Sequence, residues 1–259
     1  MKFQILSDIH LEMLKRVPVF PVLAENLILA GDIGYVGRPI WRQFLRKCVE
    51  DYKRVIYIAG NHEFYGADYD QALTTIAKEE GIIFLEKGSV DIEEAGEVVR
   101  ILGTTLWTEI PPAKMADTQM MMSDYHKIMY KGRHLTGTDS VRMHRIAKKW
   151  LRGELEKAVV EDKKVIVVTH HLPSFQMVAA KYKLENNHGF ASDCEDLIAA
   201  APVCAWVCGH SHTQMERWIG DKVCVIASIG YPSEVLRSPP HMCTLEIDGQ
   251  GKVTVDWPI

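Results

Sequence analysis

The chain has 259 residues, of which 47% are hydrophobic and 25% are charged, a balance typical of globular proteins that excludes a disordered chain or a fibre. Its 30 lysines and arginines against 34 aspartates and glutamates give a net charge of −4, so the broad basic surface of a general nucleic-acid binder is missing. No apolar stretch approaches the ~18–20 residues that cross a bilayer, and the first residues turn polar too early for a secretory signal. We therefore expect a cytoplasmic protein with no membrane partner.

The spacing of the six cysteines does not indicate a disulfide framework, because they are scattered along the chain. Cys204, Cys208 and Cys224 lie within apolar runs, where a free thiol behaves as a small buried hydrophobe. Cys204 and Cys208 are four residues apart, but no second Cys/His pair at zinc-finger spacing accompanies them. A cysteine-based metal site is therefore not expected.

The first half of the chain alternates short β-rich runs with helical segments. Strands are expected at residues 3–6, 26–30 and 54–59, and helices at 38–51 and 68–80. The apolar faces of the two helices would consist of Trp41, Phe44, Leu45 and Cys48 in the first and of Ala72, Leu73, Ile76 and Ala77 in the second. Apolar strands that alternate with helices indicate an α/β fold with buried sheets.

The second half continues this pattern, with further strands expected at residues 98–102, 165–168, 203–207 and 223–227. A longer helix would begin with Asp139 as its N-cap and carry an apolar stripe of Met143, Ala147, Trp150, Leu151, Leu155 and Ala158. Residues 242–247 and 252–257 would form a hairpin around Asp248-Gly249. No linker divides the chain, so residues 1–259 are expected to form a single domain.

Residues 108–138 interrupt the pattern. The segment contains Pro111-Pro112 and a run of methionines at 120–122, and its apolar residues follow no clear period. Two interpretations stay open: an ordinary long connection, or a cap over a binding cleft in which methionines and polar aromatic residues line the substrate. His126 and His134 of this segment are expected to be surface or cap residues.

Polar side chains follow five of the expected strands. The segments are Asp8-Ile9-His10, Gly31-Asp32, Gly60-Asn61-His62-Glu63, Thr169-His170-His171 and Gly209-His210-Ser211-His212. In open α/β sheets ligands bind beyond the carboxyl ends of the strands, so these segments can converge on one site. Each segment arises easily by chance, but all of them in this order make a specific pattern.

The residue types in these segments point to metal chemistry. Carboxylates, imidazoles and an amide suit Mn, Fe, Zn, Co or Ni. The set is larger than one tetrahedral ion needs and contains no cysteine, which argues against a closed structural zinc site. Two ions ~3.5–4 Å apart can hold a bridging hydroxide and a phosphoryl oxygen. We therefore expect two divalent transition-metal ions, with Mn first among them.

From Asp8 to His212 these segments resemble the motif set of the calcineurin-like metallophosphoesterases. The resemblance implies a four-layer α/β/β/α sandwich of two mainly mixed β-sheets flanked by helices, with a dinuclear metal centre at one end. It implies the ligands as well: Asp8, His10 and His212 for one ion, Asn61, His170 and His210 for the other, and Asp32 between both. His62 would face the scissile phosphate and protonate the leaving alkoxide, and Asn61 would help to hold the phosphate.

The resemblance implies a single ligand where the sequence offers two adjacent histidines. His170 is preferred because it comes first after its strand, and His171 would then point elsewhere or touch the substrate. Glu63 is assigned a structural role. The remaining candidates are Phe64 and Tyr65, as core or flanking residues, and residues 231–234, as a loop at the rim of the site.

These observations predict a phosphodiesterase or phosphatase that hydrolyses a small phosphoester by attack of a metal-bridging hydroxide. A nuclease of the same superfamily is an alternative, but a nuclease would need a basic track, which the acidic balance does not favour. A scaffold that kept the fold and lost the chemistry is a second alternative. Such a scaffold should show broken ligand positions, whereas all of them are filled in this sequence.

Overall fold

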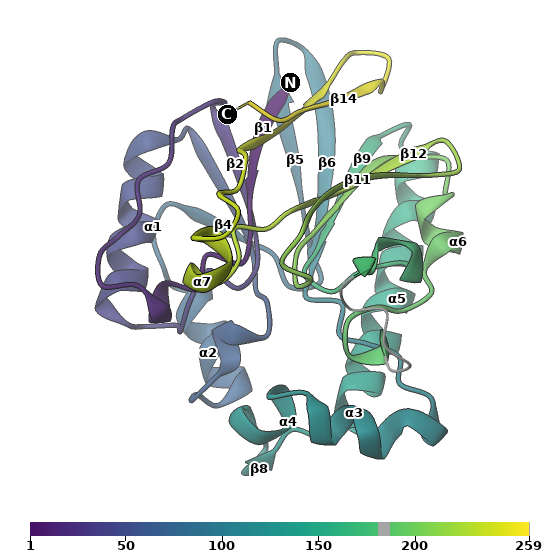
Figure 1. The fold of residues 1–259 in the computed structure, drawn as a ribbon. Coiled ribbons are helices and arrows are strands. Elements are labelled where there is room, and N and C mark those ends of the chain that lie inside the picture. Colours follow the sequence, from purple (N-terminus) through teal and green to yellow (C-terminus); the bar gives the residue numbers. More distant parts are fainter. Residues whose placement is uncertain (181–186, 259) are drawn as a thin grey trace.

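Two six-stranded β-sheets form the centre of the molecule over the residues that the computed structural model describes, 1–180 and 187–258 (Figure 1). The first sheet has the order β14 (Val253–Asp256), β13 (Cys243–Ile247), β1 (Lys2–Leu6), β2 (Asn26–Ala30), β3 (Arg54–Ile58) and β4 (Ile82–Phe84). The second has the order β11 (Gln214–Ile219), β12 (Lys222–Ala227), β10 (Val203–Cys208), β9 (Lys164–Thr169), β6 (Glu97–Thr104) and β5 (Gly88–Glu94).

Both sheets are mixed. In the first sheet β1, β2, β3 and β4 run parallel, while β13 and β14 are antiparallel to their neighbours. In the second sheet β12, β10, β9 and β6 run parallel, while β11 and β5 pair antiparallel at the two edges. Ser7, directly after β1, forms a parallel bridge with Ser228, directly after β12, so the carboxyl ends of the parallel strands of both sheets meet at one end of the molecule.

The strands supply two cores at once because successive side chains point to opposite faces of a sheet. In β9, Ile166 and Val168 pack between the two sheets. Val165 and Val167 of the same strand face outward, into a core shared with helices. Each sheet is therefore buried on both faces, which explains why the central strands are apolar throughout.

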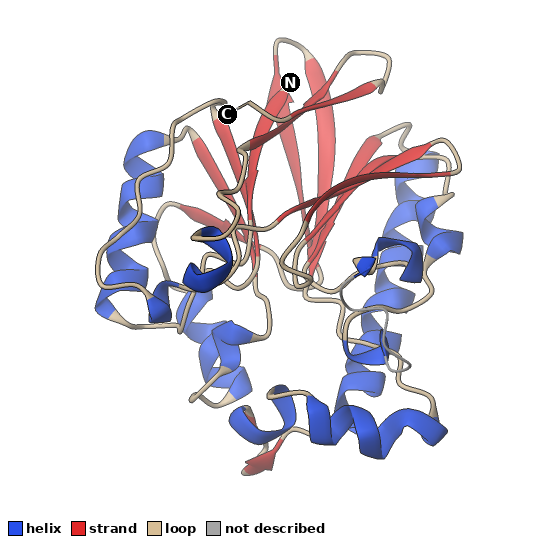
Figure 2. Ribbon diagram, viewed as in Figure 1, coloured by secondary structure: helices blue, strands red, loops and turns tan. Residues whose placement is uncertain are grey.

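Helices complete the outer layers (Figure 2). α1 (Pro39–Asp51) and α2 (Tyr69–Ala77) pack on the first sheet, and α5 (Gly137–Val160) and α6 (Glu195–Ile198) pack on the second. The order helix, sheet, sheet, helix confirms the predicted four-layer α/β/β/α sandwich. Within the described part of the chain, no helix combines the length and the apolar character needed to cross a membrane.

Two helix predictions were wrong in detail. Thr136, not Asp139, is the N-cap of α5: the Thr136 hydroxyl accepts from the Asp139 N–H, and the Asp139 carboxylate accepts from the Thr136 N–H. Asp139 is thus the third residue of the helix and the second half of a capping box. α2 ends at Ala77, which is exposed and does not belong to the buried face.

The segment 108–138 lies across the end of the sandwich where the parallel strands finish (Figure 1). It contains the short helices α3 (Met115–Met121) and α4 (Asp124–Lys127) and a small hairpin of β7 (Met129–Tyr130) and β8 (Arg133–His134). One further short helix, α7 (Pro232–Val235), follows β12 near the same end. The loops after the strands are therefore enclosed by elements from distant parts of the chain.

Candidate metal centre

The loops after β1, β2, β9 and β10 bring most of the predicted ligands together. Ligand atoms of Asp8, His10, Asp32 and His212 all lie within 4.8 Å of one another. Those of Asp32, His170 and His210 form a second group by the same measure. Asp32 belongs to both groups, so two clusters of donors share one carboxylate.

The backbone at these positions is unusual. Five of the residues have a positive φ: Asp8 (53°), His10 (52°), Asp32 (54°), His210 (68°) and His212 (41°). Residues other than glycine seldom adopt this left-handed conformation, and where they do so the surrounding structure must impose it. The turns aim carboxylate and imidazole groups from separate strands into one space.

Hydrogen bonds to the backbone orient the imidazole rings. His170 Nδ1 donates to the Ala30 carbonyl at 2.9 Å, which leaves Nε2 facing Asp32 Oδ1 at 3.4 Å. His210 Nε2 lies 3.2 Å from the Gly189 carbonyl, which leaves Nδ1 available to bind a metal ion. A ring that donates from one nitrogen presents a lone pair on the other, which is the form that binds metal.

Charge at the centre also suits a cation. Burial alone would lower the pKa of His170, but the nearby Asp32 carboxylate outweighs it and raises that pKa to about 10. Burial acts in the opposite sense on Asp32, and His170 holds the pKa of Asp32 well below its usual range. Among the protein groups alone, a proton on His170 balances Asp32. A divalent ion supplies the same positive charge when it displaces that proton, so the donor set fits a metal.

His62 lies beside these donors and lines a cleft of about 240 Å³. Its Nδ1 is 2.7 Å from Glu12 Oε1, and its Nε2 is 3.9 Å from Asp32 Oδ2. Burial lowers the pKa of His62, whereas Asp32 and Glu12 raise it, and the net effect is a rise. Nδ1 is thus directed at Glu12, and Nε2 is the nitrogen on the side of Asp32.

Glu12 is a site residue that the sequence analysis missed. It contacts both His10 and His62, and its carboxylate forms a third donor group with those two rings. Burial raises the pKa of Glu12, but its hydrogen bonds to the two histidines bring the pKa down to about 2. Its position two residues after His10, in the short 3-10 helix Leu11–Met13, was the available signal.

Asn61 presents its oxygen to the centre. Asn61 Oδ1 lies 3.0 Å from His170 Nε2. Its Nδ2 donates to the Tyr65 hydroxyl at 3.0 Å and to Asp124 Oδ1 at 2.8 Å. The two acceptors are themselves only 2.6 Å apart, so they occupy one side of the NH₂ group. This orientation of the amide is compatible with both roles predicted for Asn61.

The other sequence candidates are placed as follows. His171 is absent from the donor groups found among the described residues, and its Nδ1 lies 3.1 Å from the Thr105 carbonyl. Phe64 is a core residue that stacks on Tyr69, whereas Tyr65 lines the cleft. His126 and His134 are exposed and are not among the residues that line the cleft.

Two segments form the walls of the cleft. Met121, Met122 and Ser123 come from the segment 108–138. Tyr231 comes from residues 231–234, which were expected as a rim loop but form the N-cap and start of the helix α7, and its ring lies 4.3 Å from that of His212. Glu234 Oε2 contacts His212 Nδ1 at 2.7 Å, so this segment also orients a residue of the first donor group.

Glu63 connects two loops of the centre, the one after β2 and the one after β3. Its buried carboxylate accepts from the Tyr57 hydroxyl at 2.7 Å and from four backbone N–H groups, those of Asp32, Ile33, Gly34 and Gly60. A Cβ on Gly60 would collide with Asp32, so this close approach of two loops requires glycine. The contacts are those of the structural role expected for Glu63.

Glu63→Gln is expected to lower the free energy of unfolding by about 1.5–3 kcal/mol, because an amide turns an NH₂ group toward backbone donors that need an acceptor. Urea denaturation of the metal-stripped protein measures the change. Glu156→Gln, on the exposed face of α5, is the matched control and should change stability by less than about 0.5 kcal/mol. Equal stability of the two variants would contradict the role of Glu63.

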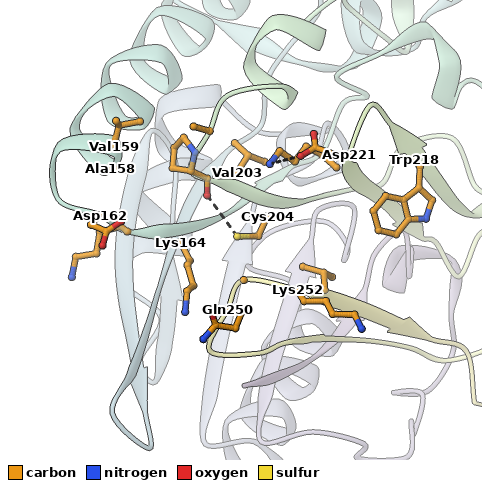
Figure 3. Close-up of a pocket in the computed structure, with 16 residues that line it drawn as sticks. Ala158, Val159, Asp162, Lys164, Val203, Cys204, Trp218, Asp221, Gln250 and Lys252 are labelled. Atoms are coloured by element: carbon orange, nitrogen blue, oxygen red, sulfur yellow. Dashed lines mark hydrogen bonds and ion pairs between the residues drawn. The ribbon is translucent and has the colours of Figure 1, made fainter.

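A larger cavity, of about 750 Å³, lies elsewhere (Figure 3). It is lined by Lys164, Val203 and Lys222, which begin β9, β10 and β12, so it opens at the end of the strands opposite to the metal donors. Lys222 pairs with Asp221 at 3.2 Å and Lys164 with Glu97 at 3.1 Å. Cys204, expected to be buried, is half-buried and faces this cavity.

Comparison with known proteins agrees with the geometry. Residues 1–214 match the family model of the calcineurin-like phosphoesterases. An uncharacterised protein of Acanthamoeba polyphaga mimivirus is 24% identical over an alignment that covers 80% of this chain and 79% of the length of that protein. A crystal structure of a phosphopantetheinyl hydrolase from Mycobacterium tuberculosis is similar with a TM-score of 0.76 at 20% identity, covering 96% of this chain and 97% of that one.

A putative 5′-nucleotidase from Staphylococcus aureus shares the fold at lower similarity, with a TM-score of 0.58 and 12% identity over 99% of this chain and 52% of that one. The family match spans most of the chain and includes every residue predicted as a ligand. The chain belongs to the calcineurin-like phosphoesterase family.

Proposed function

We propose that this protein is a phosphoesterase that uses two divalent metal ions to hydrolyse a small phosphoester. The observation that carries the proposal is the pair of donor groups that share Asp32, with His62 at the edge of the same cleft. Two ions bound there would neutralise phosphoryl oxygens and lower the pKa of water. We propose manganese for these ions, because carboxylate, amide and imidazole donors suit it.

The chain's own residues would divide the remaining work. Asp32 would hold the two cation sites together, since its two oxygens face different histidines: Oδ1 lies 3.4 Å from His170 Nε2, and Oδ2 lies 3.9 Å from His10 Nε2. His62 would donate the proton on Nε2 to the departing alkoxide. Glu12 would keep the ring of His62 in that orientation through Nδ1.

The size and lining of the cleft favour a small substrate. Its walls include Tyr65, Met122, Phe190 and Tyr231 beside the polar donors. Aromatic and methionine side chains suit an ester group with an apolar or planar part. A phosphopantetheinyl ester belongs among the substrates to test, because a hydrolase named for that group shares the fold along nearly the whole chain.

The test is a metal titration followed by rate measurements. Protein stripped with a chelator should be inactive, should bind two Mn²⁺ per chain, and should then hydrolyse a chromogenic phosphodiester or the matching monoester. A preference for the diester would define a phosphodiesterase and a preference for the monoester a phosphatase, and both support the proposal. A protein that binds no metal and hydrolyses neither ester would overturn it and favour a scaffold.

A further inference from the structure

Asn61 can serve the centre only in one of its two amide orientations. An amide binds a metal ion through its oxygen, since its NH₂ group has no lone pair to offer at neutral pH. The two orientations have nearly the same shape, so packing alone does not choose between them. Something near Asn61 has to distinguish the oxygen from the nitrogen.

Asp124 makes that distinction. Its side chain is buried at 2% exposure, and its Oδ1 accepts from Asn61 Nδ2 at 2.8 Å and from the Tyr65 hydroxyl at 2.6 Å. A carboxylate only accepts hydrogen bonds. If the amide of Asn61 were reversed, its oxygen would face the Asp124 carboxylate and its NH₂ group would face His170.

The backbone holds Asp124 in place. The Gly66 N–H donates to the Lys127 carbonyl at 3.1 Å, and the Met129 N–H donates to the Ala67 carbonyl at 3.3 Å. Tyr65 and Ile128 also form an isolated antiparallel bridge. The segment that carries Asp124 is thus fastened to the loop that carries Asn61, although the two are about 60 residues apart in the chain.

We propose that Asp124 is a positioning residue that holds the oxygen of Asn61 toward one of the two metal ions. The inference rests on the proposed dinuclear function and adds a contribution from the segment 108–138 to it. This segment therefore does more than line the cleft. It determines whether one of the two cation sites has its full set of ligands.

Calorimetric titration of the metal-stripped protein with Mn²⁺ tests the inference. Asp124→Ala should lower the affinity for one of the two ions by about 10–100-fold, the usual loss when a hydrogen-bond partner of a ligand is removed. The affinity for the other ion should not change. Asp124→Asn should lose less Mn²⁺ affinity, because its amide oxygen can still accept the hydrogen bond from Asn61. Asp117→Ala, at an exposed position of α3, is the control and should bind both ions normally.

A double variant separates orientation from general damage to the fold. In Asn61→Asp both oxygens of the new side chain can bind metal, so no orientation has to be chosen. Asp124→Ala should then weaken Mn²⁺ binding no further in the Asn61→Asp background. The same loss in both backgrounds would overturn the inference and assign Asp124 a structural role.

The two proposals can fail separately. If the unmodified protein does not bind two ions, the dinuclear function fails. If it binds two and both Asp124 variants bind them equally well, only the role of Asp124 fails. Melting temperatures of the stripped proteins identify any variant that is unfolded. If Asp124→Ala is unfolded, Asp124→Leu, which keeps the volume and offers no acceptor, decides: it should weaken the binding of one ion, and normal binding of both ions would overturn the role of Asp124.

Discussion

His62→Ala is expected to lower kcat by about 10²–10⁴-fold, the range that a general acid contributes, while two Mn²⁺ still bind. The ring of His62 is not part of the two donor groups that share Asp32, and its Nε2 is 3.9 Å from that carboxylate. Removing it leaves the shared carboxylate and the other imidazoles in place. Turnover of the Mn²⁺-reconstituted protein and its metal content, measured on one preparation, check both parts.

The leaving group provides a sharper version of this test. An alkoxide needs a proton as it departs, whereas a nitrophenolate is stable without one. The defect of His62→Ala should therefore be much larger on an alkyl ester than on a nitrophenyl ester. Equal defects on both esters, or wild-type turnover on the alkyl ester, would remove His62 from the role of proton donor.

Asp32→Asn is expected to weaken Mn²⁺ binding at both sites by at least 100-fold and to abolish activity at ordinary metal concentrations. Asp32 is the one residue common to both donor groups, and its Oδ1 also accepts from the His62 N–H at 2.8 Å. An asparagine can keep that hydrogen bond, but it removes a negative charge and one of the two ligand oxygens.

Metal content after dialysis, together with calorimetry, measures this loss. Asp221→Asn is a suitable control, because Asp221 is exposed and forms an ion pair with its neighbour Lys222, far from the donor groups. Asp8→Asn should weaken the binding of mainly one ion, since Asp8 belongs to only one of the two donor groups that share Asp32. Two ions retained by Asp32→Asn with unchanged affinity would exclude a shared carboxylate.

The buried strands could be predicted from the sequence because each of them is apolar on both faces. β2 and β10 are examples, with almost every residue buried. β11 and β5 escaped prediction because they lie at the edges of the second sheet, and their patterns mix exposed and half-buried residues. An edge strand has lost the apolar run that identifies a central strand.

Some residues of the site could likewise be predicted from the sequence, and others could not. Its metal donors follow apolar strands directly, so their approach to one another follows from the direction of the strands. Asp124 lies in a segment without periodicity, and its contact with Asn61 depends on how that segment folds back over the strand ends. Glu12 lies close to His10 in the chain, but its contact with His62 depends on a loop from another strand.

The left-handed backbone of the five donor residues has a consequence for the evolution of this chain. A residue other than glycine held in that conformation costs about 1–2 kcal/mol, and five such positions converge here. A lineage released from the need for metal would gain robustness by exchanging these side chains for glycine. Selection for metal binding would keep these side chains and would hold the free energy of unfolding below the value that the fold could otherwise reach.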